Sequence, residues 1–365
     1  MAAVREEKDR LHSSVDDKST LAGQDHWREI PRQDLPNWNE QLLQTSASVF
    51  QYPYWCEPFR RMHFSPRYLV YGPPHEPKLY VCILMTGIPG LRIGLIQRGP
   101  VSLVPGSDAS RAALQDLSRW ARRKGFIFLR FSHSDQEVLR QVGELDSAET
   151  ADPFPFYRDA NEELWVEHAG EDAQTMISFQ PVARRKIKKA TKAGYRLEFD
   201  DSPETFVQVW PLFQALSTRK NFRYRPLASY LELIRLGYPH KCVRIYTAHL
   251  GSKLAEAILI IRDSTAAYCI SGALDMDAIK DVASPSCLLH WSAMRDFFHE
   301  GIKYYSLGTR SGAVYQFKRQ FRPIIKNHPL PVTLVLNRPA YVLWSKLVLR
   351  FGPSIWPHVK RLLSR

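Results

Sequence analysis

Two stretches, "ARRKGFIFLRF" at residues 121–131 and "FFHEGIKYYSL" at residues 297–307, decide the fold. Each starts as the end of a helix, passes through Gly125 or Gly301, and continues as a strand rich in aromatic residues. A glycine just past the last turn is a common way for a helix to end, because glycine readily adopts the backbone conformation required there. The same helix–glycine–strand unit therefore occurs in both halves of the chain.

The elements around these two units follow one another in the same order. In the first half we expect helical segments at 37–59 and 107–125, and strands at 68–72, 78–88, 91–101 and 126–131. In the second half we expect helices at 202–222, 226–238 and 284–301, and strands at 242–250, 253–263, 265–274 and 302–307. This repetition predicts an α+β fold of tandem duplicated domains, each with a mixed, mostly antiparallel sheet flanked by helices. The alternative is a pair of unrelated α/β domains.

The length of 365 residues is more than one small core requires, so we expect two domains and two flanking segments. Residues 1–36 are polar and without periodicity, which predicts a disordered tail. The first domain is expected at 37–165 and the second at 166–335. Residues 336–365 form a basic amphipathic tail with six basic residues and no acid.

The net charge of +13 favours an anionic partner such as nucleic acid, anionic lipid or a phosphorylated substrate. The five cysteines are scattered and form no CxxC pair, which argues against a zinc cluster or a disulfide framework. The N-terminal residues lack the apolar stretch of a signal peptide, and no run reaches the roughly 18 apolar residues that cross a bilayer. We therefore expect a cytoplasmic protein, or one lying on the inner face of the cell membrane.

The stretch "SFQPVARRKIKKATKAGYRL" at 178–197 contains seven basic residues and no acid. On a helix, Ile187 and Ala190 would face inward. The outward basic face would consist of Arg184, Lys188 and Lys192 on one stripe, with Arg185 and Lys189 beside it. Because no acid neutralises it, this face predicts an RNA backbone, a diphosphate substrate or an anionic membrane as partner. The alternative is a charged face that is only solvated.

The segment 164–199 resembles the FemAB/FemX-type members of the GNAT superfamily, in the basic pattern R-x-x-I-x-K-A-x-K-x-G that runs from Arg184 to Gly194. Four further stretches are similar to the family in the same order: "QRGPV" at 97–101, "STRKNF" with "YRPLASYL" at 217–231, "SPSCLLHWSAMRDFFHEGIKYYSLGT" at 284–309, and "VYQFKRQFRP" at 314–323. The resemblance covers about residues 38–335. It implies two GNAT-like domains that share a cleft, and the transfer of an aminoacyl or acyl group to an amine.

Lys318 is the candidate for a catalytic role. It lies between Phe317 and Phe321, which would pack together on one side of a helical turn. An ammonium in apolar surroundings can stabilise developing negative charge. The resemblance implies the same, since the lysine of the family's F-K element lies at the active site, and it makes Phe317 a substrate-binding candidate. The alternative is a solvated lysine beside an aromatic anchor.

The resemblance further implies substrate contacts by Arg98, Arg219, Tyr224, Tyr268 and Trp291. A planar guanidinium suits a diphosphate, which supports Arg219. As alternatives, Arg219 could simply complement the negative end of its helix, and Tyr268 and Trp291 could be ordinary core residues.

The sequence contains no GxSxG motif and no recognisable Cys/His signature, so we expect direct attack by a neutral amine without a covalent enzyme intermediate. The stretch "DMDAIKDVASPSCLLHW" at 275–291 is acidic and has no glycine, which makes it a poor cradle for a CoA pyrophosphate. We therefore expect aminoacyl-tRNA rather than acyl-CoA as the co-substrate, with no cofactor and no metal.

The leading hypothesis is a FemAB-like transferase that moves an aminoacyl group from charged tRNA to an amine of a diphosphate-linked cell-envelope precursor, as in peptidoglycan biogenesis. One alternative is an acyl-CoA-dependent N-acyltransferase that modifies an exopolysaccharide or a lipid. The other is a non-catalytic GNAT fold that binds RNA or membrane.

The tail from residue 339 predicts a helix with Leu343 and Leu347 on one side and Lys346 and Arg350 on another, which suits peripheral contact with an anionic membrane. Alternatively, this helix docks on the second domain.

Overall fold

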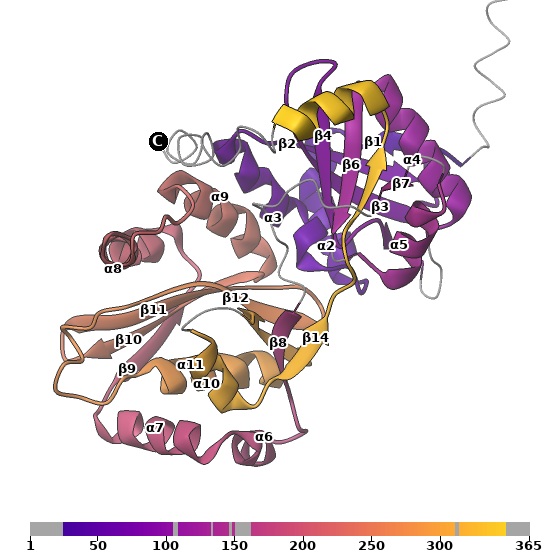
Figure 1. The fold of residues 1–365 in the computed structure, drawn as a ribbon. Coiled ribbons are helices and arrows are strands. Elements are labelled where there is room, and N and C mark those ends of the chain that lie inside the picture. The colour runs from indigo at the N-terminus through magenta and orange to yellow at the C-terminus, as the bar shows by residue number, and fades with distance from the viewer. Residues whose placement is uncertain are drawn as a thin grey trace, which may run out of the picture.

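The computed structural model describes residues 25–104, 109–132, 134–145, 148–149, 162–310 and 314–347. They form two sheets, each flanked by helices (Figure 1). The helices are α2 (Leu35–Leu43), α3 (Pro53–Cys56), α4 (Arg111–Arg123), α5 (Gln136–Gly143), α6 (Asp172–Ser178), α7 (Pro181–Lys192), α8 (Pro203–Lys220), α9 (Leu227–Gly237), α10 (Ser286–His299) and α11 (Tyr315–Lys318), followed by a helix at 338–347. The strands are β1 (Trp27–Glu29), β2 (Ser65–Tyr71), β3 (Leu79–Thr86), β4 (Arg92–Gln97), β5 (Val101–Ser102), β6 (Phe126–Ser132), β7 (Ala148–Glu149), β8 (Glu162–Glu167), β9 (Arg196–Asp200), β10 (Val243–Leu250), β11 (Lys253–Arg262), β12 (Ala266–Leu274), β13 (Tyr304–Thr309), β14 (Ile324–Asn327) and β15 (Val332–Val335).

The duplication is visible in the pairing of the strands. The first sheet has the order β1-β2-β3-β4-β6-β15-β7, with β5 on β3, and the second has the order β14-β8-β13-β12-β11-β10-β9. Among the described strands, each sheet contains one parallel pair, β4 with β6 and β12 with β13. The second strand of each pair follows a helix and a glycine with positive φ, Gly125 at 74° and Gly301 at 85°. The predicted α+β fold with two mostly antiparallel sheets is confirmed.

A hydrophobic core joins the two domains. It contains side chains from α2, α3 and β3 of the first half and from α8, α9, β10 and β11 of the second. Polar contacts cross the same boundary, since the Val49 amide donates to Asp263 Oδ2 at 3.0 Å and the Tyr54 hydroxyl donates to the Arg262 carbonyl at 2.7 Å. The two sheets are therefore held together by buried apolar surface as well as by hydrogen bonds.

The opposite face of the second sheet has its own core. Helices α7 and α10 cover it through side chains such as Ile187, Trp291 and Phe297. Figure 1 shows α8 and α9 on one side of this sheet and α6, α7 and α10 on the other.

The observed domain boundaries differ from the predicted ones at three strands. β1 lies within the segment predicted to be disordered, because Trp27 is buried against Tyr71 and its indole N–H donates to the Ala113 carbonyl at 2.7 Å. β8, most of which was assigned to the first domain, belongs to the second sheet. β15, assigned to the second domain, pairs with β6 and buries Leu334 in the first core. The remainder of the predicted disordered tail, residues 1–24, lies outside the described residues.

The helix at 338–347 lies on the first sheet, not on the second domain (Figure 1). Tyr341 and Trp344 both contact the ring of Phe128, with centroids 5.6 and 5.0 Å apart. The rest of the predicted tail, from residue 348 on, lies outside the described residues.

Candidate functional site

Strands β12 and β13 are neighbours at the centre of the second sheet, but they separate along their length. Their parallel pairing joins Ala266 to Tyr304 and ends with Tyr268 opposite Ser306, whereas β12 continues to Leu274. Beyond Ser306 the register between β13 and β8 is also interrupted. The outer half of β12 is therefore not paired with β13, and several of the predicted site residues lie around it.

Lys318 lies at the end of β13. Its Nζ donates to the carbonyl oxygen of Thr309 at 2.9 Å, and a Cβ at Gly308 would lie 3.7 Å from the same nitrogen. Burial lowers the pKa of Lys318 below its ordinary value, although Cys269 and Glu163 oppose the shift. The ammonium is therefore partly desolvated, which strengthens its interaction with a developing negative charge.

Phe317 anchors the turn that carries Lys318. Its ring lies 5.5 Å from that of Phe321 and 5.4 Å from that of His290, measured between centroids. Phe321 is fully buried, so the predicted packing of the two phenylalanines on one side of the turn is present. Burial, together with the charge of Lys318, lowers the pKa of His290 to about 4, so this imidazole is neutral at physiological pH. Phe317 thus packs into the core beneath the lysine and fixes its position.

Arg219 and Tyr224 contact the outer half of β12 from the side of α8 and α9. The Tyr224 hydroxyl donates to the Gly272 carbonyl at 2.8 Å, and Arg219 Nη2 donates to the Leu274 carbonyl at 3.4 Å. Arg219 remains exposed, so its guanidinium can still reach a bound anion. Burial raises the pKa of Tyr224 well above its usual range, which keeps its hydroxyl protonated.

Arg98 connects the first domain to this strand. It follows β4 with a φ of 57°, and its side chain is nearly enclosed. Nη2 donates to Glu163 Oε2 at 2.6 Å and Nη1 to the Tyr268 hydroxyl at 3.3 Å, while the guanidinium lies 4.4 Å from the centre of the Phe50 ring. Because Glu163 already occupies Nη2, the predicted contact between Arg98 and a substrate remains a prediction.

Glu163 is the centre of a buried polar cluster between the domains. In addition to Arg98, it accepts hydrogen bonds from Ser306 Oγ at 2.6 Å and from His328 Nε2 at 3.0 Å. Burial alone would raise the pKa of Glu163, but the charge of Arg98 and the hydrogen bonds from His328 and Ser306 outweigh it and hold the pKa well below its ordinary value. Glu163 is therefore ionised at physiological pH.

A cavity of about 790 Å³ opens beside Arg98 in the first domain. Its polar wall includes Gln41, Gln44 and the loop at 45–48, and its apolar wall includes the segment at 100–104. Arg98 thus lines this cavity and also contacts Tyr268 on β12. The volume is sufficient for a sizeable part of a small-molecule substrate.

Two predicted aromatic contacts are core residues. Tyr268 is buried, and its hydroxyl donates to Asp263 Oδ2 at 3.1 Å. Trp291 is buried on the opposite face of the sheet, where its ring lies 5.5 Å from that of Phe179. The structure therefore favours the alternative of a packing role for both residues.

Residues 178–319, which contain β12, β13 and Lys318, match the family described as acetyltransferase (GNAT) domain. This segment of the chain is therefore a GNAT domain. No curated protein matches it in sequence.

Solved structures share the tandem fold of the chain. The structure of FemX is 13% identical, with a TM-score of 0.73, and the match covers 88% of this chain and 100% of FemX. A conserved protein of unknown function from Bacteroides thetaiotaomicron is 8% identical, with a TM-score of 0.60 over 85% of this chain and 99% of that one. The C-terminal domain of a putative lysylphosphatidylglycerol synthetase from Agrobacterium fabrum is 12% identical, with a TM-score of 0.55 over 87% and 96%. The predicted FemX-like fold is confirmed.

The basic face of α7 has the predicted geometry. Ala183, Ile187 and Ala190 are buried, while the five basic side chains lie on the outer side of the helix. Within the described part of the chain, no carboxylate forms an ion pair with these five side chains. The second domain therefore presents an unneutralised cationic surface.

Two acidic residues of the site region were not predicted. Glu163 lies in a strand with other acids, and nothing in its sequence surroundings distinguishes it. Glu256 is different, because it is the only acid in the apolar run at 254–261, which could have indicated a buried carboxyl. Its side chain is buried below α10 and hydrogen-bonded to Ser286, its Oε2 has no hydrogen-bond partner, and burial raises its pKa to about 8.

The described His, Cys, Asp and Glu side chains form no group that could hold a metal ion. No helix in the described ranges combines the length and the apolar character needed to cross a bilayer.

Proposed function

We propose that this GNAT acyltransferase moves an aminoacyl group from charged tRNA to an amine of a diphosphate-linked cell-envelope precursor. The observation that carries the proposal is the arrangement around β12: Lys318 lies at one side of the strand's outer half, and Arg219 and Tyr224 contact the other. An acyl transfer needs a cation near the oxyanion and anchors for an anionic substrate, and these residues supply both.

In the reaction, the neutral amine of the acceptor attacks the ester carbonyl of the aminoacyl group. A C–N bond forms, the ester C–O bond breaks, and the tRNA hydroxyl leaves with the proton that the amine gives up. Lys318 stabilises the negative charge on the carbonyl oxygen. Arg219 holds a phosphate of the precursor, and Tyr224 fixes the position of the α8–α9 connection by its hydrogen bond to Gly272.

The surroundings of α10 support tRNA over acyl-CoA as the donor. The N-terminus of a helix that follows a strand is a natural site for a pyrophosphate. Here the buried carboxyl of Glu256 hydrogen-bonds Ser286, the first residue of α10, and the preceding loop carries Asp275, Asp277 and Asp281. A CoA pyrophosphate placed there would meet the carboxylates of these three aspartates.

The basic face of α7 supports the same choice. Its side chains extend over about two and a half helical turns without an acid, a spacing that can follow a nucleic-acid backbone. One similar fold is named a putative lysylphosphatidylglycerol synthetase, and lysylphosphatidylglycerol is an aminoacylated lipid, the same broad class of product. The cavity beside Arg98 would hold part of the acceptor.

The test is a transfer assay with radiolabelled aminoacyl-tRNA and radiolabelled acyl-CoA in parallel, each with a panel of diphosphate-linked amine acceptors. We expect label in the acceptor only from aminoacyl-tRNA. Turnover only with acyl-CoA would establish the alternative of an N-acyltransferase. No turnover with either donor, together with tight tRNA binding, would establish a non-catalytic binding protein.

A further inference from the structure

The hairpin between β3 and β4 has an apolar tip that projects from the first domain. Residues 87–91 are all exposed, and the side chains of Ile88 and Leu91 are 64% and 47% accessible. The turn is well defined, since the Leu91 amide donates to the Ile88 carbonyl at 2.9 Å. Gly87 has a φ of 104°, and a Cβ there would lie 2.4 Å from the Leu91 carbonyl oxygen, so the sequence is suited to this tight turn. The rigid turn therefore presents two aliphatic side chains to solvent.

The helix at 338–347 exposes a second apolar strip. Its inner side is fixed by Tyr341 and Trp344 on Phe128. Its outer side carries Leu343 and Leu347, which are 60% and 49% accessible, together with the exposed Lys346.

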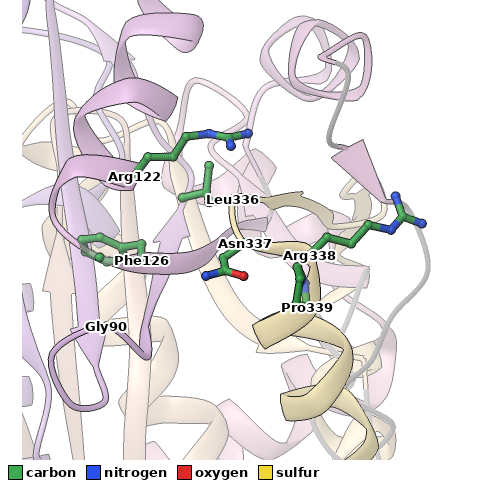
Figure 2. Close-up of a pocket in the computed structure, with 8 residues that line it drawn as sticks. Gly90, Arg122, Phe126, Leu336, Asn337, Arg338 and Pro339 are labelled. Carbon is green, nitrogen blue, oxygen red and sulfur yellow. The ribbon is translucent and has the colours of Figure 1, made fainter.

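These two elements lie on opposite sides of one pocket. A cavity of about 420 Å³ is lined by Gly90 of the hairpin and by residues 336–339 at the start of the helix (Figure 2). Arg122 at the end of α4, Gly125 just after the helix and Phe126 of β6 complete the lining. Figure 2 shows the hairpin loop on one side of the pocket and the helix on the other. The two apolar strips therefore belong to one region of the first domain.

The charge of this region is one-sided. The segments at 87–93, 121–126 and 336–347 contain no acid and six basic residues: Arg92, Arg122, Arg123, Lys124, Arg338 and Lys346. One of these, Lys124, pairs with Glu29 of β1 at 2.8 Å. Aliphatic side chains surrounded by arginine and lysine are the composition of surfaces that insert into the headgroup layer of an anionic bilayer. A protein partner with a matching apolar face would not require this excess of cations.

We propose that the hairpin tip at 87–91 and the outer side of the helix at 338–347 together form a docking surface for an anionic phospholipid membrane. Ile88, Leu91, Leu343 and Leu347 enter the headgroup layer, and the five basic residues other than Lys124 contact lipid phosphates. This surface belongs to the first domain, whereas Lys318 and the basic face of α7 belong to the second. Membrane binding is therefore independent of the proposed chemistry, and the failure of either proposal leaves the other standing.

The test compares the full-length protein and its variants in co-sedimentation with phosphatidylcholine vesicles that do or do not contain phosphatidylglycerol. We expect wild-type protein to bind only the anionic vesicles. The variant Ile88→Asp with Leu91→Asp leaves the terminal helix intact and is expected to lose roughly tenfold or more in partitioning, because two aliphatic insertions are replaced by anions. Leu343→Asp with Leu347→Asp is expected to have an effect of similar size.

A matched control is available on the second domain. Ile177 and Val207 are 64% and 49% accessible, nearly the same as Ile88 and Leu91, and the variant Ile177→Asp with Val207→Asp should bind like wild type. Thermal melting of each variant verifies folding. Unchanged binding by the hairpin variant, or loss of binding in the control alone, would overturn the proposal. So would sedimentation showing a wild-type dimer that the hairpin substitutions dissociate, since the surface would then join two copies of the chain.

Discussion

Arg98 Nη2 lies 2.6 Å from Glu163 Oε2, and this contact joins the end of β4 in the first sheet to β8 in the second. Both side chains are almost completely enclosed. An ion pair in such surroundings gains little over a well-packed apolar pair, but losing one member leaves a buried charge without its partner. The pair therefore adds a buried ionic contact to the apolar core and the hydrogen bonds that hold the two domains together.

Replacing that carboxylate should destabilise the protein strongly. Glu163→Gln removes the charge opposite Arg98 and is expected to lower the free energy of unfolding by about 3–5 kcal/mol, as measured by urea denaturation. Glu162→Gln is the matched control, because the neighbouring Glu162 pairs with Arg310 at 3.2 Å in an exposed position. Exposed pairs contribute about 0–1 kcal/mol, so equal effects of the two substitutions would contradict the structural role of Glu163.

The same carboxylate should make the protein sensitive to acid. The pKa of Glu163 is held below its ordinary value of 4.5 in the folded state. The contribution of Glu163 to stability is therefore present at a pH above the ordinary pKa. It is lost as the pH falls through the pKa that Glu163 has in the folded protein. In urea titrations at decreasing pH, wild type should lose stability more steeply than Glu163→Gln.

Lys318→Ala should lower turnover by about 10²-fold or more, the usual effect of losing a group that stabilises an oxyanion. Arg319→Ala, at the next and exposed position, is the control and should retain normal turnover. Near-normal turnover of Lys318→Ala at saturating substrates would contradict a catalytic role of Lys318.

The activity of the wild-type protein should also depend on the protonation of Lys318. Burial lowers the pKa of Lys318 below its ordinary value of 10.5, so activity should decline at a lower pH than it would if this lysine were exposed. Lys318→Arg should shift that decline to higher pH.

Charge reversal on α7 should weaken the binding of tRNA. Arg185→Glu with Lys189→Glu removes two phosphate contacts, so binding should weaken. The slope of the logarithm of the binding constant against the logarithm of the salt concentration should become shallower by about two, because about two fewer counterions are released. Lys253→Glu with Lys280→Glu changes the charge equally at exposed positions elsewhere on the second domain. If both variants show the same salt slope, the basic face of α7 is only solvated.

Glu256 should make stability fall at alkaline pH. Burial raises its pKa from 4.5 to about 8, so the folded protein holds a proton that the unfolded chain has lost. This contribution to stability is full below the ordinary pKa and is lost as the pH rises through about 8. Glu256→Gln imitates the protonated carboxyl, and its stability should decline less than that of wild type between about pH 5 and pH 9 in urea titrations. Parallel curves would show that the carboxyl is not buried as the structure places it.

The repetition of elements and the basic helix could be predicted because they are local patterns. Gly125 and Gly301 end their helices through backbone conformation, and the inward position of Ile187 follows from helical spacing. The positions of Lys318, Arg219 and Tyr224 followed from the resemblance to a family, and the structure gathers them around β12.

Other features depend on contacts between distant segments. The role of Glu163 depends on Arg98 and His328, which lie 65 and 165 residues away in the chain. The domain boundary was misplaced for a similar reason, because the apolar alternation of β15 suits either sheet and only its pairing with β6 decides between them. The terminal helix was expected on the second domain or on a membrane, whereas its aromatic side chains bind the first sheet and its aliphatic ones remain exposed.

The return of β15 to the first sheet has a consequence for synthesis of the chain. The second domain is inserted between β7 and β15, both of which belong to the first sheet, so a ribosome must release residues up to 335 before that sheet can close. Until then β6 is an open edge, with Phe128, Leu129 and Phe131 accessible to other chains. A fragment that ends at residue 161 would keep this edge permanently. We therefore expect it to aggregate, although it contains nearly every other strand of the first sheet.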